Sequence, residues 1–230
     1  MTACLLACGV DPTRSILFQQ SSVPAHAELS WILGCHTTMA RLARLPMFKE
    51  KSGKLKEVPL GLYIYPILQS ADILLYKTTR EREVASVRSL RNPAQKMSKS
   101  DPDPKSRINL TDTPDQIRGK VKKALTDFTS EVTFDPANRP ALANLIAVHS
   151  AASGLSAAEI CVRSRGLETA QYKMAVADAL VARFEPIRGE MERLSRDAAY
   201  LRSVLDAGAE RAAKVAEVTL REVKHLVGFD

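Results

Sequence analysis

The pattern of apolar residues changes near Ile108, and this change constrains the fold more than any other feature of the 230-residue chain. Beyond Ile108, apolar residues recur at helical spacing. Before it, helical stretches are joined by a short apolar run at residues 16–18 and by a polar stretch of weak periodicity at 77–107. A short apolar run next to turn residues is typical of a buried parallel strand. We therefore predict an α/β domain over residues 1–108 and an all-helical domain over residues 109–230.

The first part of the chain contains three predicted helices. Gly9 is the kind of residue that commonly follows a helix, and Pro24 fits the first turn of the next one. A polar, Lys-rich loop is expected from Phe48 to Glu57. The predicted helices cover residues 1–9, 24–44 and 62–76, and Ser21 or Ser22 is expected to cap the second one.

The second part carries explicit helix-start signals. Thr113 and Gln116 form a capping box with a proline between them, and Ser156 and Glu159 form a second one. A longer helix is indicated by apolar residues at helical spacing, and a last helix is predicted to run to Gly228. The residues that mark the longer helix are Tyr172, Val176, Leu180 and Phe184.

The charge of the chain favours a polyanionic partner. The formal net charge is +7, and nine basic but only four acidic side chains lie between Lys77 and Arg107. That stretch has no aromatic residue, which suits contact with phosphates better than stacking on bases. No stretch approaches the roughly 20 apolar residues that a membrane-spanning helix needs, so we expect no membrane association.

Cysteine and histidine usage predicts neither disulfides nor a metal site. The four cysteines are too few and too scattered for a disulfide framework, and no set of ligands at finger spacing completes a zinc site. His26 is interpreted as a structural residue at a helix start. No chemistry is assigned to the other histidines. These residues are Cys4, Cys8, Cys35 and Cys161, and His36, His149 and His225.

Asp72 interrupts an otherwise apolar helical segment. A carboxylate in such surroundings is costly unless a donor hydrogen-bonds it. The donor is either another part of the protein, such as an arginine or a helix N-terminus, or a ligand. An indole ring offers one such donor, its N–H. The residue pattern alone leaves both interpretations open.

The segment Lys96-Met97-Ser98-Lys99-Ser100 places two ammonium groups three residues apart, with two hydroxyls between and beside them. Lysines follow phosphate oxygens as mobile point charges, and loop amides and hydroxyls add short-range hydrogen bonds. A generic Lys-x-x-Lys turn is usually only a solvated basic turn. Here all five letters, followed by Asp-Pro, match the KMSKS signature of class I aminoacyl-tRNA synthetases. The chain around it resembles the tryptophanyl-tRNA synthetases, most closely the bacterial and mitochondrial ones.

This resemblance implies a fold and a reaction. The fold is an incomplete Rossmann-like nucleotide-binding domain followed by a helical domain on the tRNA and anticodon side. The reaction joins tryptophan to ATP, giving tryptophanyl adenylate, and then transfers tryptophan to tRNA(Trp). The resemblance also implies Mg²⁺ with the ATP, a homodimer, and the mitochondrial matrix, with the cytoplasm as the alternative.

Site residues follow from the matching motifs. Asp72 would accept the indole N–H, and Tyr65 and Gln69 on the same helix would line the tryptophan pocket. Lys96, Lys99 and, from the opposite side, Lys51 would be the catalytic cations that contact ATP. The residues implied in ATP binding are Val87, Lys96, Met97, Ser98, Lys99 and Ser100.

Two family segments have no match in the chain. Nothing before Cys4 resembles the His-x-Gly-His-like signature of class I synthetases. The Gly-Glu-Asp-Gln segment that follows the tryptophan helix in the family is also missing. In its place, Lys77-Thr78-Thr79 leads almost directly into residues 80–83 and on to Lys96. The alternative to a working ligase is therefore a shortened, catalytically impaired variant that only binds tRNA or dimerises. A tyrosyl-tRNA synthetase is a third possibility, against which the Gln-Ser-Ala-Asp context of Asp72 argues.

Overall fold

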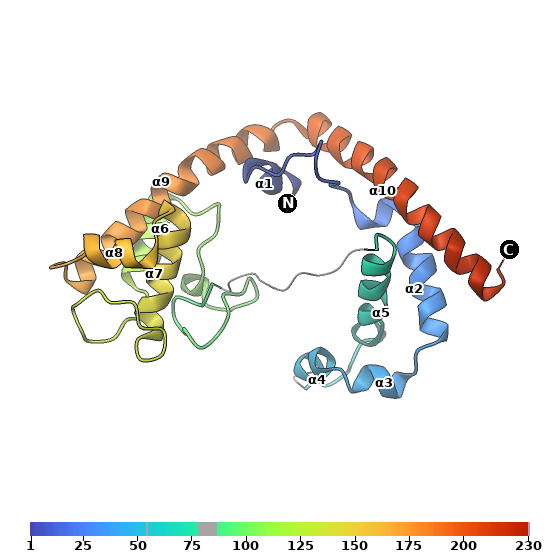
Figure 1. Cartoon of the computed structure of the whole chain (residues 1–230), viewed down its shortest axis with the longest axis horizontal. Helices are drawn as coiled ribbons and strands as arrows, with labels where there is room; N and C mark the ends of the chain where they lie inside the picture. The colour runs from blue at the N-terminus through green and yellow to red at the C-terminus, as the bar shows by residue number, and fades with distance from the viewer. Residues whose placement is uncertain (54, 78–86, 230) are drawn as a thin grey trace. The chain divides into compact units, whose positions relative to one another are not determined.

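The computed structural model describes residues 1–53, 55–77 and 87–229. They belong to two compact units, and each unit is described by itself (Figure 1). Unit 1 comprises Met1, Ala3–Gly9 and Glu83–Arg196. Unit 2 comprises Thr2, Val10–Arg82 and Asp197–Asp230. Each unit thus combines segments that lie far apart in the sequence.

Unit 2 contains helices from both ends of the chain. Its longest helix, α10, begins after the capping residue Asp197 and ends at Gly228, which has the left-handed φ of +77° typical of a helix-ending glycine. The elements of unit 2 are the 3₁₀ turn η1 (Gln20–Ser22), α2 (Ala25–Cys35), α3 (Met39–Ala43), α4 (Pro46–Ser52), α5 (Leu60–Leu74) and α10 (Ala198–Val227).

The core of unit 2 lies among three helices. α2 packs along α5, and α10 packs on α2 (Figure 1). Leu29, Leu75 and Ala216 are among the buried residues of this core, and the hydroxyl of Thr219 donates to the carbonyl of Leu75 over 2.9 Å. Small residues on α10, such as Ala216, permit the close approach of α10 to α2. The core therefore depends on contacts between the last thirty residues and the first eighty.

Unit 1 is a bundle around a second, separate core. α9 packs against both α6 and α7 (Figure 1). Tyr172, Ile117, Leu142 and Ile146 are fully buried where these helices meet. The elements of unit 1 are α1 (Thr2–Ala7, of which Thr2 belongs to unit 2), η2 (Pro104–Ser106), α6 (Pro114–Lys122), α7 (Pro140–Ser153), α8 (Ala157–Arg163) and α9 (Thr169–Ser195).

The local helix signals are confirmed. Thr113 and Gln116 form both hydrogen bonds of a capping box at the start of α6, and Ser156 and Glu159 do the same for α8. Gly9 follows α1 with a φ of +94°. These features form where predicted because each needs only residues within one helical turn.

The predicted strand at residues 16–18 is wrong. This segment is not a strand, and within the described ranges the only β pairing is an isolated antiparallel bridge between Arg88 and Lys96. A buried parallel strand needs a paired neighbour on its edges, and the described residues supply none. The α/β class predicted for residues 1–108 is therefore not found in the described residues, whereas the helical character of the second part is.

Two further predictions need correction. The helix predicted over residues 24–44 is interrupted after Cys35, because Thr38 adopts an extended conformation and caps a new helix, accepting from the amide of Arg41. The loop predicted over residues 48–57 begins inside α4, for which Pro46 at the first helical position supplies a suitable start. Part of the predicted polar loop at 77–107, residues 78–86, lies outside the described residues.

Among the described residues, no single helix is both long and apolar enough to cross a membrane. α7 and α8 meet the length and composition criteria only as a pair, with a bend of 100° between them. The four cysteines are free thiols.

Candidate functional site

The KMSKS segment in unit 1 begins in a short antiparallel pairing with residues 87–89. The amide of Ser89 donates to the carbonyl of Gln95, and the amide of Met97 donates to the carbonyl of Val87, each over 2.9 Å. Beyond Met97, the Ser98 hydroxyl accepts from the amide of Ser100 over 3.2 Å. This pairing positions the start of the segment, while the ammonium groups remain at the surface.

A pocket of about 730 Å³ lies against this segment. Of the six residues implied in ATP binding around the KMSKS segment, five line this pocket and Ser100 does not. Lys96 and Lys99 are both exposed, so their ammonium groups are accessible to an anion. The five residues are Val87, Lys96, Met97, Ser98 and Lys99.

Arg107 is a pocket residue that sequence reasoning missed. It lines the same pocket, and its guanidinium Nη1 donates to the carbonyl of Asp101 over 2.8 Å. A third cation thereby lines the pocket, and its hydrogen bond holds the backbone of Asp101, the residue that directly follows the KMSKS segment. Its position in a basic stretch, eight residues after Lys99, is the only sequence signal for it.

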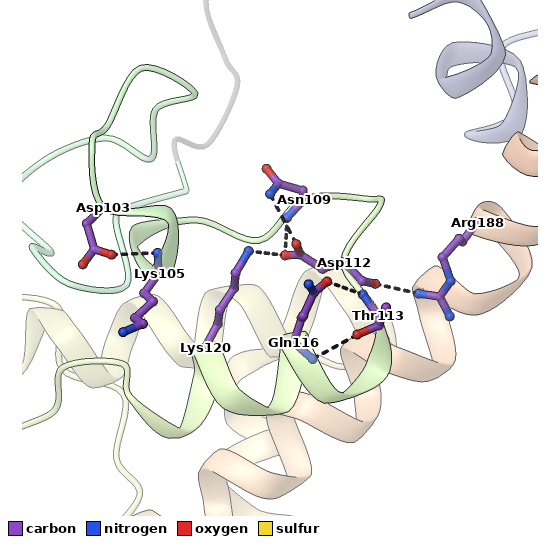
Figure 2. Close-up of polar contacts among 8 residues, drawn as sticks. All are labelled: Asp103, Lys105, Asn109, Asp112, Thr113, Gln116, Lys120 and Arg188. Atoms are coloured by element: carbon purple, nitrogen blue, oxygen red, sulfur yellow. Dashed lines mark hydrogen bonds and ion pairs between the residues drawn. The ribbon is translucent and has the colours of Figure 1, made fainter.

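The segment after KMSKS is anchored to the helical bundle through Asp112 (Figure 2). Its carboxylate forms an ion pair with Lys120 on α6 and accepts the amide of Asn109 over 2.8 Å. Its backbone carbonyl accepts from Nη1 of Arg188 on α9, also over 2.8 Å. Only 8% of the Asp112 side chain and 11% of the Lys120 side chain are exposed. These contacts hold residues 109–112 firmly against α6 and α9.

In unit 2, the predicted tryptophan residues lie on α5. Asp72 is half-buried, and its Oδ1 lies 2.6 Å from Nδ1 of His26 and 2.7 Å from Nε2 of Gln20. Nε2 of His26 in turn lies 2.9 Å from the hydroxyl of Tyr76. The donors to Asp72 thus come from α2 and η1, and among the described residues no arginine pairs with it.

Tyr65 and Lys51 lie together in unit 2. The ammonium of Lys51 sits 4.6 Å from the centre of the Tyr65 ring, a cation–π contact. The Tyr65 hydroxyl is buried and has no hydrogen-bond partner among the described residues. Gln69, one turn further along α5, is half-buried. Lys51, predicted as an ATP contact, therefore shares a unit with the predicted tryptophan residues, whereas the KMSKS segment belongs to unit 1.

Burial and charge act together on Tyr76. Removal from water raises the pKa of its hydroxyl, and the negative charge of Asp72 raises it further. Tyr76 therefore stays protonated at neutral pH and can donate its hydrogen. The rings of Phe18 and Tyr76 lie 5.8 Å and 5.5 Å from that of His26, so the imidazole is enclosed by aromatic surfaces.

The described residues contain no group of three or more histidine, cysteine or acidic side chains that could hold a metal ion.

Comparison with known proteins identifies the family. The family model of the class I tRNA synthetases for tryptophan and tyrosine matches residues 1–87 and 79–185. The chain belongs to this family. The mitochondrial tryptophan–tRNA ligase of Caenorhabditis elegans is 38% identical over 268 positions, covering 100% of this chain and 74% of the relative. The tryptophan–tRNA ligase of Caulobacter vibrioides is 40% identical, covering 100% of this chain and 78% of its own length.

A solved structure gives a similar result. The tryptophanyl-tRNA synthetase of Campylobacter jejuni, determined with ADP and tryptophan, superposes with a TM-score of 0.77 at 25% identity. The superposition covers 99% of this chain and 81% of the other. This class I synthetase therefore shares its fold with the described chain.

The family match also explains the junction near residue 80. The alignment with the worm protein extends over 268 positions, although this chain has only 230 residues. The family model matches in two pieces, which overlap at residues 79–87. Family residues without a counterpart here are thus expected at this junction, as the missing Gly-Glu-Asp-Gln segment predicts.

Proposed function

We propose that this chain is a tryptophan–tRNA ligase that activates tryptophan with ATP and transfers it to tRNA(Trp). The observation that carries the proposal is the pocket of unit 1, where five predicted ATP residues gather in a chain that belongs to the class I synthetases. The relatives that match along the whole chain are named tryptophan–tRNA ligases, and the Campylobacter structure holds tryptophan and ADP.

On the ATP side, the residues act by position and charge. A carboxylate oxygen of tryptophan attacks the α-phosphorus, the bond to the bridging oxygen breaks, and pyrophosphate leaves. Lys96 and Lys99 neutralise the charge that develops on the phosphate oxygens, and Lys51 contributes a further positive charge to ATP binding. Such catalysis depends on preorganised cations rather than on a covalent intermediate. Mg²⁺ enters with ATP as the substrate complex.

The remaining ATP contacts lie in or next to the KMSKS segment. The backbone of Val87 contacts adenine, and Met97, Ser98 and Ser100 shape the segment around the phosphates. The hydrogen bond between the Ser98 hydroxyl and the Ser100 amide supports this proposal because it holds the backbone on either side of Lys99. Arg107 adds a cation on the same wall of the pocket.

On the amino-acid side, Asp72 accepts the indole N–H, while Tyr65 and Gln69 line the pocket for the ring and the backbone of tryptophan. The orientation of Asp72 by two donors supports this role, because an oriented carboxylate selects a ligand that brings a donor. The described residues of α5 carry all three side chains on one helix.

We further assign residues 1–108 to a partial class I synthetase catalytic domain and residues 109–230 to the helical tRNA and anticodon side. The enzyme acts as a homodimer without membrane attachment, in the mitochondrial matrix. Relatives of both mitochondrial and bacterial kinds match at similar identity, so the cytoplasm is the alternative. Import of the chain into isolated mitochondria tests the first location.

A second candidate function is a shortened synthetase that binds tRNA or dimerises without catalysis. The observation that favours it is the two-piece family match, together with the lack of paired strands in the described part of residues 1–108. A nucleotide-binding sheet normally supplies part of the ATP site at its strand ends.

Tryptophan-dependent exchange of pyrophosphate into ATP separates the two functions. The full chain is expected to catalyse the exchange, and Lys96→Ala is expected to lower it by about a hundredfold or more. Lys123 is an exposed lysine that does not line the pocket, so Lys123→Ala is the matched control and is expected to keep the rate. A folded sample without exchange refutes the ligase and leaves the binding function. Exchange driven by tyrosine instead of tryptophan refutes the substrate.

A further inference from the structure

Asp72 is held by two donors on one of its oxygens. His26 Nδ1 and Gln20 Nε2 both contact Oδ1, at 2.6 Å and 2.7 Å. A carboxylate can only accept hydrogen bonds, so the His26 proton lies on Nδ1. Two donors from separate elements fix the plane of the carboxylate. Its second oxygen, Oδ2, then has a set direction for a third donor.

The second ring nitrogen of His26 also has a hydrogen-bond partner, on the side away from Asp72. The residue is only 4% exposed, and its Nε2 lies 2.9 Å from the Tyr76 hydroxyl. Burial and the charge of Asp72 raise the pKa of Tyr76, so the hydroxyl keeps its hydrogen beside Nε2. A chain of hydrogen bonds therefore runs from Tyr76 through the His26 imidazole to Asp72. In such a chain each bond orients the next group.

We propose that His26, assisted by Gln20, is a positioning residue for tryptophan selection, holding Asp72 so that Oδ2 accepts the indole N–H. This inference rests on the proposed function. Neither residue touches the reacting atoms. Both act through Asp72. This carboxylate discriminates tryptophan from an analogue without the indole N–H, because the analogue leaves the oriented Oδ2 without a donor. The interpretation of His26 as only a structural residue is replaced by this role.

The test compares two ligands that differ at the donor. The full chain is titrated by calorimetry with L-tryptophan and with 3-benzothienyl-L-alanine, which carries sulfur in place of the indole N–H. The measured quantity is the ratio of the two dissociation constants. The wild-type chain is expected to favour tryptophan, and His26→Leu is expected to lower the ratio by about tenfold or more.

Further variants separate positioning from folding. His26→Asn keeps an N–H directed at Asp72 and is expected to retain most of the ratio. Gln20 is exposed, so Gln20→Met folds even if His26→Leu does not, and it is expected to lower the ratio as well. The neighbouring exposed Gln19 gives the matched control, Gln19→Met, with an unchanged ratio.

The outcomes distinguish this inference from the proposed function. A purely structural role for His26 weakens both ligands equally and leaves the ratio unchanged, which would overturn the inference while tryptophan binding stands. An unchanged ratio in Gln20→Met removes Gln20 from the proposal. A folded wild-type chain that binds neither ligand overturns the proposed function, and the inference with it.

Discussion

Replacing Lys120 with methionine should reveal how strongly the segment after KMSKS is anchored. Lys120 neutralises Asp112 in a site where both side chains are almost fully buried. Methionine has a similar length and fills the space, but it carries no charge and no donor. The carboxylate of Asp112 would then stay buried. Among the described residues, Asn109 would be its remaining hydrogen-bond donor, through the backbone amide at 2.8 Å and the side-chain Nδ2 at 3.3 Å.

The magnitude follows from this burial. Removing one partner of a buried ion pair costs about 3–5 kcal/mol, because the remaining charge is uncompensated. The two donors of Asn109 compensate in part, so the lower end, about 3 kcal/mol, is expected. For a domain of roughly 120 residues, this corresponds to a fall in Tm of about 12 °C. That is a large part of a typical stability of about 5–15 kcal/mol.

The assay is thermal unfolding, combined with hydrogen exchange followed by mass spectrometry. Exchange should accelerate in peptides from α6 and α9, which belong to unit 1, before it does in peptides from α2 and α5 of unit 2. The exposed Lys122 on the same helix provides the control, Lys122→Met, whose effect should stay within about 0.5 kcal/mol.

A double variant tests the physical reason. Asp112→Asn combined with Lys120→Met removes both charges and keeps an oxygen that accepts the Asn109 amide. This variant should regain more than half of the lost stability, because no unpaired charge remains buried. If Lys120→Met costs no more than Lys122→Met, or if the double variant is less stable than the single one, the uncompensated carboxylate is not the cause and the reasoning fails.

Two more predictions concern stability, each measured by the urea midpoint. Gly208→Ala should destabilise unit 2 by about 1–3 kcal/mol, because a Cβ there would lie 1.7 Å from the carbonyl oxygen of Leu17, whereas Gly34→Ala meets no atom within 4 Å and should stabilise slightly. A stable Gly208→Ala would show that the two backbones are not so close. The hydrogen bond from Arg139 lowers the pKa of Asp127, so this pair stabilises the fold above the ordinary value of 3.8 and loses that effect as pH falls through the lowered pKa. The midpoint difference between wild type and Arg139→Gln should therefore shrink from pH 7 to pH 3, and a constant difference would contradict the assignment.

Features that depend on a few neighbouring residues were predictable. The capping boxes at Thr113 and Ser156 and the glycine after α10 formed as predicted, because a helix end is stabilised by residues within one turn. The KMSKS letters also identified the family, because the signature is contiguous. The same locality explains why five of the six predicted ATP residues line one pocket.

Features that depend on distant partners were missed. The run at residues 16–18 has the composition of a strand but finds no strand to pair with in the described ranges. Arg107 lines the pocket together with Lys96 and Lys99, but it stands outside the KMSKS letters and carries no motif of its own. His26 was interpreted as a helix-start residue because its partners Asp72 and Tyr76 are 46 and 50 residues away.

The sequence by itself thus determined the helix starts at Thr113 and Ser156 and the family, since each is specified by neighbours along the chain. Only the tertiary structure decided that α10 completes the core of the unit containing α2 and α5, and which donors orient Asp72. These contacts form when segments far apart in the chain bury apolar surface together, and their geometry depends on how all the segments pack. No local pattern contains that information.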